Sequence, residues 1–232
     1  MISLRIDQHE LHLLPGKAVW RPASRTLYVA DLHIGKASAF ARGGIPLSDE
    51  LLARSTASDL VRLSALIEAQ RAERLVILGD LLHAPAGRDQ RTMSQLAHWR
   101  ASHDGVEVVL IRGNHDHAAG DPPSDAGIDC VDAPSDAAGL RLVHHPLEPT
   151  DGVPTLAGHV HPFVRLASIG DAARCACFWL SDNQLVLPAF GGFTGGFSVS
   201  PRQGDRVFVA APERVLEIPV VTAATRGSGR PR

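Results

Sequence analysis

Five short stretches of the sequence carry acidic, imidazole and amide side chains directly after an apolar run. They are Asp31-Leu32-His33, Gly79-Asp80, Gly113-Asn114-His115-Asp116, His144-His145-Pro146 and Gly158-His159-Val160-His161. Eight of the 12 histidines of the chain lie in or beside these stretches. A simple surface loop does not need such residues at five separate places, so the pattern indicates one site assembled from distant parts of the chain.

The side-chain types in these stretches are those that bind divalent metal ions. Carboxylates, imidazoles and one amide, with no thiolate, suit Mn²⁺, Fe²⁺ or Zn²⁺ and not a zinc site built from cysteines. Roughly seven such ligands are too many for one ion and fit two ions that share a carboxylate, for which Asp80 is the natural bridge. Two ions about 3.5–4 Å apart activate water and clamp the reacting oxygens of a displacement at phosphorus.

Short strands must position these side chains. The apolar runs at residues 27–30, 75–78, 108–111, 140–143 and 155–157 predict strands that end where the polar residues begin. Because residues two apart in an extended chain point to the same side, we expect Asp31 to align with His33 and His159 with His161. Ligands from several strand ends meet in the crevice at the carboxyl edge of an α/β sheet.

Two helices and a β-rich second half complete the expected architecture. Capping residues and apolar spacing predict helices over residues 48–70, capped by Ser48, and over residues 90–101, capped by Asp89. After residue 160 only strands are expected, over residues 163–168, 174–180, 185–187, 207–210 and 215–218. The pattern predicts an α/β chain with two packed mixed β-sheets flanked by helices. We expect a single domain over residues 1–222 and a disordered tail over residues 223–232.

Composition narrows the possible partners and compartment. The chain of 232 residues has a formal charge of −2 and a pI near 6.6, so it lacks the basic stripe of a tight duplex binder. A nucleic-acid substrate would therefore be held locally, at the site. Three cysteines without CxxC spacing favour reduced thiols in a cytoplasmic protein. No signal segment or membrane-spanning apolar run is visible, and no membrane partner is expected.

The five stretches, in this order, resemble the calcineurin-like metallophosphoesterase superfamily. The resemblance implies the metallophosphoesterase fold, with a dinuclear metal site at the C-terminal ends of the strands. One ion would be held by Asp31, His33, Asp80 and His161, and the other by Asp80, Asn114, His144 and His159. His145 stays an alternative to His144, which we favour because it lies directly at the strand end. His115 would protonate the leaving group, Asp116 would orient its imidazole, and Gly113 would let the backbone pass close to the ions.

Four longer strings narrow the resemblance further. LYVADLHIGKASAFARGGIPLSDE, LGDLLHA, AGHVHP and LPAFGGFTGG are similar to the bacterial ligase-associated DNA damage response endonucleases. That resemblance implies metal-dependent cleavage of DNA in repair, together with a DNA ligase, a helicase and an exonuclease-like protein. We expect two Mn²⁺ ions, with Fe or Zn as alternatives, and a preference for single strands. The alternative function is a small-molecule phosphodiesterase or pyrophosphatase that acts on cyclic nucleotides or nucleotide sugars. A scaffold without activity is disfavoured, because the whole set including His115 is present.

Three further residues are candidates for contacts with the substrate. Arg112 is expected to bind phosphate or to form a salt bridge, and Lys36 to bind phosphate or to be an ordinary surface lysine. Phe193 lies between Phe190 and Phe197 in a glycine-rich segment, where exposed rings could stack on unpaired bases. The alternative for these rings is that they close the core beneath the metal ions.

Overall fold

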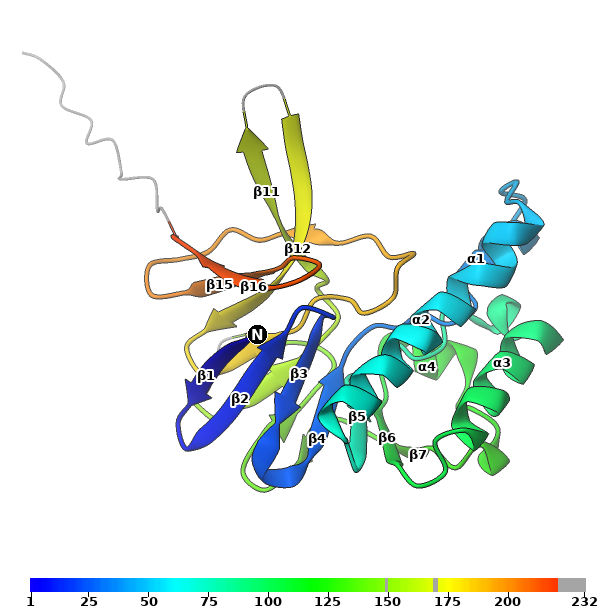
Figure 1. The fold of residues 1–232 in the computed structure, drawn as a ribbon, viewed down its shortest axis with the longest axis horizontal. Helices are drawn as coiled ribbons and strands as arrows, with labels where there is room; N and C mark the ends of the chain where they lie inside the picture. Colours follow the sequence, from blue (N-terminus) through cyan, green and yellow to red (C-terminus); the bar gives the residue numbers. More distant parts are fainter. Residues whose placement is uncertain (149, 169–170, 221–232) are drawn as a thin grey trace, which may run out of the picture.

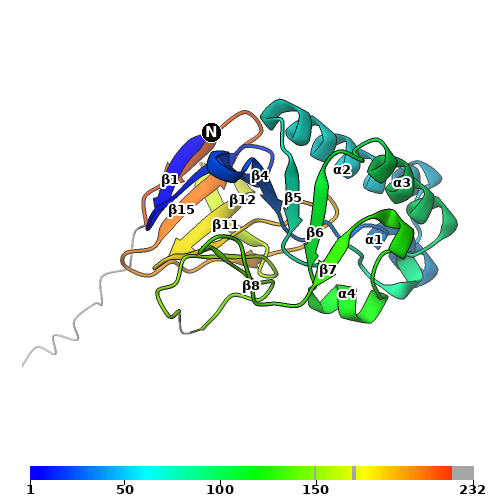
Figure 2. The same ribbon diagram turned by 90° about the horizontal axis from the view of Figure 1, so that it is seen from below.

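Alternate residues of the central strands face two different cores, and this places the strands between two layers. The computed structural model describes residues 1–148, 150–168 and 171–220. On strand β5, Leu75 and Ile77 pack against helices, whereas Val76 packs against a second β-sheet. Figure 2 shows helices α2 and α3 on one side of β5 and β6, and strands β12 and β15 on the other side. The predicted architecture of two packed mixed sheets with flanking helices is confirmed.

The first sheet has seven strands in chain order. They are β1 (Ile2–Ile6), β2 (His9–Leu14), β3 (Ala18–Arg21), β4 (Thr26–Val29), β5 (Arg74–Ile77), β6 (Glu107–Ile111) and β7 (Asp129–Val131). Strands β1 to β4 form an antiparallel meander, and β4 to β7 run parallel. The meander β1–β3, within the first 25 residues, was not predicted from the sequence.

The second sheet supplies the other ligand strands. Its members are β8 (Ser135–Asp136), β9 (Arg141–Leu142), β10 (Thr155–Ala157), β11 (Pro162–Ser168), β12 (Asp171–Ser181), β13 (Gln184–Val186), β14 (Phe197–Ser198), β15 (Arg206–Ala210) and β16 (Val215–Ile218). The order is β14-β11-β12-β13-β10-β9-β8, with β15 and β16 attached beside β12. Strands β9, β10 and β13 run parallel, so their carboxyl ends point the same way. Strands β11 and β12 form a long hairpin that projects from the body of the molecule (Figure 1).

Helices α2 (Asp49–Gln70) and α3 (Gln90–Ala101) cover the first sheet (Figure 1). Both predicted N-caps are confirmed: the Ser48 side chain accepts from the Leu51 amide at 3.2 Å, and Asp89 accepts from the Thr92 amide at 2.8 Å. Each cap satisfies an amide that the first helical turn leaves without a backbone partner. Helix α2 buries Leu60, Leu63 and Ile67 in the core that it shares with the first sheet.

Two short helices were not predicted and both lie beside the candidate site. Helix α1 (Lys36–Arg42) follows the stretch that contains Asp31 and His33. Helix α4 (Asn114–Ala119) contains Asn114, His115 and Asp116. Single turns of 3-10 helix occur at η1 (Pro22–Ser24), η2 (Pro85–Gly87) and η3 (Ser124–Ala126).

The structure bears on the expected absence of a membrane partner and on the predicted domain bounds. Within the described residues, none of the helices combines the length and apolarity needed to traverse a bilayer. The single domain over residues 1–222 stays a prediction, and the tail at 223–232 lies outside the described residues.

Candidate metal centre

The predicted ligands converge because they follow the carboxyl ends of neighbouring parallel strands. Asp31 and His33 follow β4, Asp80 follows β5, and Asn114 follows β6, all in the first sheet. The ligands from the second sheet are His144 after β9 and His159 and His161 after β10. Backbone hydrogen bonds tie these loops together, among them Asp31 N–H to Gly79 O at 3.1 Å and Gly158 N–H to His144 O at 3.0 Å.

Five of the seven predicted ligands have left-handed backbone conformations. The φ angles are 56° at Asp31, 49° at His33, 55° at Asp80, 68° at His159 and 50° at His161. A residue other than glycine pays about 1–2 kcal/mol for this conformation, and such strain is common at functional sites. The expectation of an extended chain at these pairs is therefore wrong, although both members of each pair still reach the site.

One group of ligand atoms gathers around His33 and His161. The Nε2 atom of His33 lies 3.3 Å from Nε2 of His161 and 3.7 Å from Oδ2 of Asp80. The Nε2 atom of His161 lies 3.2 Å from Oδ1 of Asp31. These four side chains are those predicted for the first ion.

A second group gathers around His144. Its Nε2 atom lies 3.1 Å from Oδ1 of Asn114, 3.2 Å from Nδ1 of His159 and 3.5 Å from Oδ1 of Asp80. The two carboxylate oxygens of Asp80 thus face different groups, with Oδ2 toward His33 and Oδ1 toward His144. This is the arrangement that a bridging carboxylate requires.

The donor set fits divalent metal ions. Ligand atoms bound at about 2.0–2.2 Å to one ion lie roughly 3–3.6 Å from one another, close to the spacings found here. Burial, and then the neighbouring His161, lower the pKa of His33 to about 2. Burial, and then His145, lower the pKa of His159 to about 4. Both imidazoles are therefore neutral at pH 7, as metal coordination demands.

The two adjacent histidines after β9 have different environments. The His144 ring is buried, and its Nδ1–H donates to Leu78 O at 2.9 Å, which leaves Nε2 to face Asp80 and Asn114. A Cβ at Gly79, where φ is 82°, would lie 2.0 Å from this Nδ1, so only glycine fits there. His145 is exposed and packs its ring on His159, with centroids 4.0 Å apart. The placement favours His144 as the ligand.

Asp116 does not contact the imidazole of His115, so the predicted orienting role is wrong. Its buried carboxylate accepts from the amides of Asp80 at 2.7 Å, Gly113 at 2.9 Å and Leu82 at 3.1 Å. Asp116 therefore holds the loop that carries Asp80 against the start of α4. Gly113 allows this contact, because a Cβ there would lie 2.2 Å from Oδ1 of Asp80.

His115 is oriented by His83, which the sequence analysis left without a role. The Nδ1–H of His115 donates to His83 O at 2.6 Å, and the two rings stack with centroids 4.8 Å apart. The Nε2 atom of His115 lies 4.0 Å from Oδ2 of Asp80, and 35% of the side chain is exposed. The Nδ1 atom of His83 lies 3.2 Å from Nδ1 of His33. In the sequence, His83 lies three residues after Asp80, within the string LGDLLHA.

Arg112 is already paired, which matches the salt-bridge alternative. Its guanidinium donates to Asp121 at 2.7 and 2.8 Å and to Asp132 at 3.0 Å. It lines a pocket of about 720 Å³ that borders the second ligand group through Asn114 and His144. His117 lines the same pocket.

The three phenylalanines of the glycine-rich segment have different environments. Phe190 is fully buried in the core under the guanidinium of Arg62, which matches the alternative that this ring closes the core. Phe193 is half-buried and packs edge-on against Phe40, with centroids 5.8 Å apart. Phe197 is 62% exposed.

Lys36 begins helix α1, half-buried, with Nζ 5.6 Å from the centre of the Phe40 ring. Burial lowers the pKa of Lys36, although the negative charge of Asp80 opposes the shift. The position beside the first ligand group is compatible with a phosphate contact.

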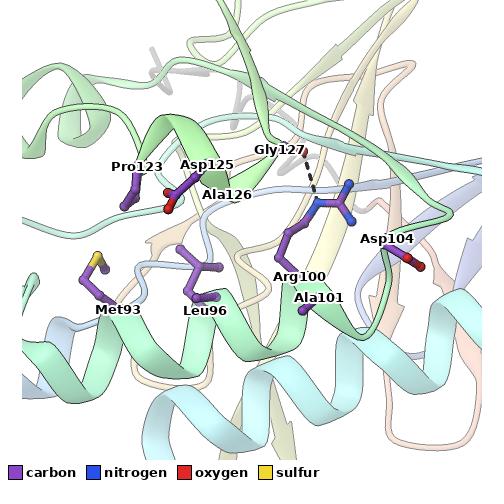
Figure 3. Close-up of a pocket in the computed structure, with 10 residues that line it drawn as sticks. Met93, Leu96, Arg100, Ala101, Asp104, Pro123, Asp125, Ala126 and Gly127 are labelled. Atoms are coloured by element: carbon purple, nitrogen blue, oxygen red, sulfur yellow. Dashed lines mark hydrogen bonds between the residues drawn. The ribbon is translucent and has the colours of Figure 1, made fainter.

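A separate pocket of about 270 Å³ lies between α3 and η3 (Figure 3). Its walls include Met93, Leu96 and Pro123, and Arg100 closes one side by donating to Gly127 O at 3.1 Å. None of its lining residues is a predicted ligand, so this pocket is not part of the metal centre.

Comparison with known proteins agrees with this fold and donor set. Residues 24–172, which include all seven predicted ligands, match the family model of the calcineurin-like phosphoesterases, and the chain belongs to this family. It is a metal-dependent phosphoesterase, as the sequence motifs predicted.

Two solved structures illustrate the range of similarity. The nuclease MPE of Pseudomonas putida is 39% identical, with 94% of this chain and 99% of that chain covered and a TM-score of 0.80. Yfce, a phosphoesterase from E. coli, is 13% identical over 84% of this chain and 99% of that chain, with a TM-score of 0.41. No curated protein matches the chain.

Proposed function

We propose that this phosphoesterase is a nuclease that hydrolyses DNA phosphodiesters, single strands in preference to duplexes. The observation that carries the proposal is the similarity to the P. putida nuclease, which extends over 94% of the chain. The two ligand groups joined by Asp80 support it, because hydrolysis at phosphorus commonly uses two adjacent ions.

We assign the two ligand groups to two divalent ions. Asp31, His33 and His161 would hold one ion, Asn114, His144 and His159 the other, and Asp80 both. Oxygen and imidazole donors without a thiolate favour Mn²⁺, with Fe²⁺ and Zn²⁺ as alternatives. Such ions supply activated water and charge neutralisation at the phosphoryl group.

His115 is the proposed proton donor to the leaving oxygen. Its side chain is partly exposed, and its Nδ1–H is held by the His83 carbonyl. A carbonyl can only accept, so Nδ1 keeps its proton whether the ring is charged or neutral. The proton that is transferred is therefore the one on Nε2, the nitrogen that faces Asp80.

His83 is the proposed positioning residue for both His33 and His115. If Nδ1 of His83 accepts the Nδ1–H of His33, the lone pair of His33 Nε2 is directed toward Asp80 and His161. Ligand histidines commonly donate their second N–H to such an outer partner, which fixes their tautomer. The His83 ring also limits rotation of His115 by stacking on it.

A small-molecule phosphodiesterase is the second candidate. The pocket of about 720 Å³ beside Asn114 and His144 has the size of a site for a small ligand. A cyclic nucleotide or nucleotide sugar is the substrate that this pocket would suit.

A substrate panel separates the two candidates. We expect the Mn²⁺-loaded protein to hydrolyse bis-nitrophenyl phosphate faster than nitrophenyl phosphate and to cut single-stranded DNA faster than duplex. The Asp80→Asn variant, purified in parallel, controls for contaminating nucleases. Fast hydrolysis of a cyclic nucleotide while DNA stays intact would overturn the proposal.

We further propose that the enzyme works in the cytoplasm, in DNA repair, alongside a DNA ligase, a helicase and an exonuclease-like protein. The three free cysteines support a reducing compartment. Co-purification from cells with DNA damage is the direct test of these partners.

A further inference from the structure

The hairpin of β11 and β12 begins directly beside the metal centre. Pro162, its first residue, follows His161, and the hairpin then projects from the body of the molecule (Figure 1). Arg165 lies three residues further along β11. At about 3.3 Å per residue, Arg165 stands roughly 13 Å along the strand from His161.

Two arginines lie directly opposite each other on this hairpin. The antiparallel register pairs Arg165 with Arg174, and both side chains are exposed. Like charges at directly opposed positions of a strand pair repel each other and destabilise the pair. The arginine ion pairs among the described side chains involve other arginines. An anion placed between the two guanidinium groups would remove this repulsion.

The side chain of Arg174 packs on the aromatic ring of Phe163. Its guanidinium carbon lies 3.9 Å from the centre of the Phe163 ring, which is within the range of a cation–π contact. Phe163 is opposite Ala176 in the register, so Phe163, Arg165 and Arg174 share one face of the hairpin. The stack orders Arg174 and leaves its charge on the surface.

The chemistry of the pair selects the anion. Guanidinium groups bind phosphate through paired N–H donors, which makes arginine the preferred residue for recognising nucleic-acid backbones. The whole chain has a formal charge of −2, so these arginines form a local positive feature and not part of a general basic surface. Their distance from His161 suits a phosphate some nucleotides away from the one that is cleaved.

We propose that Arg165 and Arg174 form a phosphate-binding arm that holds a DNA strand beyond the metal centre. This proposal rests on the proposed nuclease function and extends it, since it explains how a chain with a formal charge of −2 holds a polymer. A substrate too short to reach from the metal centre to the arm gains nothing from it. Long single strands gain affinity that depends on salt concentration.

The test uses Arg165→Gln, Arg174→Gln and the double variant, with Arg54→Gln as the matched control. Arg54 is an exposed arginine on α2, so the control makes the same change of charge as each single variant, at a different place. We measure KM and kcat on a labelled single strand of about 20 nucleotides and on bis-nitrophenyl phosphate, over a range of salt concentrations. We expect the double variant to raise KM for the oligonucleotide about tenfold and to make the log–log salt slope shallower by about 1.4, two phosphate contacts at roughly 0.7 each. We expect kcat, and hydrolysis of bis-nitrophenyl phosphate, to change less than twofold.

Two failures are distinguishable in this design. If the unaltered protein cuts the oligonucleotide and the double variant keeps its KM and salt slope, the arm is refuted and the nuclease function stands. An Arg54→Gln effect equal to that of Arg165→Gln or Arg174→Gln also refutes the arm, because net charge would then explain the result. If the unaltered protein neither binds nor cuts the oligonucleotide, the arm falls together with the proposed function.

Discussion

The left-handed conformation of His159 has a measurable consequence for stability. At a φ of 68°, alanine would keep the strain of about 1–2 kcal/mol, whereas glycine would not. Glycine costs about 0.5–1 kcal/mol through its greater freedom in the unfolded chain. The His159→Gly variant should therefore be more stable than His159→Ala by about 0.5–1 kcal/mol. Both variants lack the exposed imidazole of His159, so its loss contributes equally to their stabilities.

His115 provides the matched control, because it lies in helix α4 and has no left-handed angle. The His115→Gly variant should be less stable than His115→Ala by about 0.5–1 kcal/mol, which is the opposite order to that expected at His159. Urea unfolding of all four variants in EDTA measures both differences, and with an m-value of about 2–3 kcal/mol/M each corresponds to roughly 0.3 M in the midpoint. If His159→Ala is as stable as His159→Gly or more stable, the left-handed backbone of His159 carries no strain and the explanation is refuted.

The remaining predictions concern the metal centre and its surroundings. Asp80→Asn should reduce metal content at both sites, whereas His33→Ala should mainly affect one; elemental analysis that finds only one ion per unaltered chain at saturation contradicts the dinuclear site. His115→Ala should keep both ions and lose roughly 10²–10⁴-fold in kcat, with a smaller loss for a nitrophenolate leaving group; equal losses for good and poor leaving groups argue against proton donation. His83→Ala should weaken metal affinity about 10–100-fold by freeing the His33 ring, with His83→Gln partly restoring it; titration with Mn²⁺ measures this, and an unchanged affinity excludes the positioning role. Burial raises the pKa of Cys177 to about 12, so its thiol stays protonated at pH 8 and should resist iodoacetamide in the folded protein; mass spectrometry that finds equal alkylation with and without urea contradicts this.

The candidate metal ligands could be found in the sequence because each one follows a short apolar run. Strands β4, β5 and β6 are buried on both faces, so their apolar runs are unbroken, and the polar residues mark where they end. The meander β1–β3 was not predicted, although β1 alternates buried and exposed residues as a half-buried strand does. In β2 the buried His9 occupies an inward position and interrupts the apolar pattern. Strands of two residues such as β9 depend on pairing with distant segments, which no local pattern reveals.

The wrong expectation for Asp116 has a simple geometric cause. Adjacency in the sequence suggested a contact with His115, but consecutive residues on a helix point in directions about 100° apart and do not face each other. Helix α4 therefore turns His115 toward His83 and Asp116 toward the backbone amides of Asp80 and Leu82. The ion pairs of Arg112 could not be predicted, because Asp121 and Asp132 lie 9 and 20 residues away along the chain and only the fold brings them close.

Each group of ligands draws side chains from both sheets. Asp31 and His33 follow a strand of the first sheet and His161 one of the second, and Asn114 meets His144 and His159 in the same way. An ion bound by such a group joins segments that lie 128 residues apart along the chain at His33 and His161. A disulfide that closes a loop of about 100 residues stabilises the folded state by about 4–5 kcal/mol, because it lowers the entropy of the unfolded chain. A metal ion that joins distant ligands has the same effect. In a protein whose three cysteines are all free, the catalytic ions would then also be the cross-links that fasten one sheet to the other.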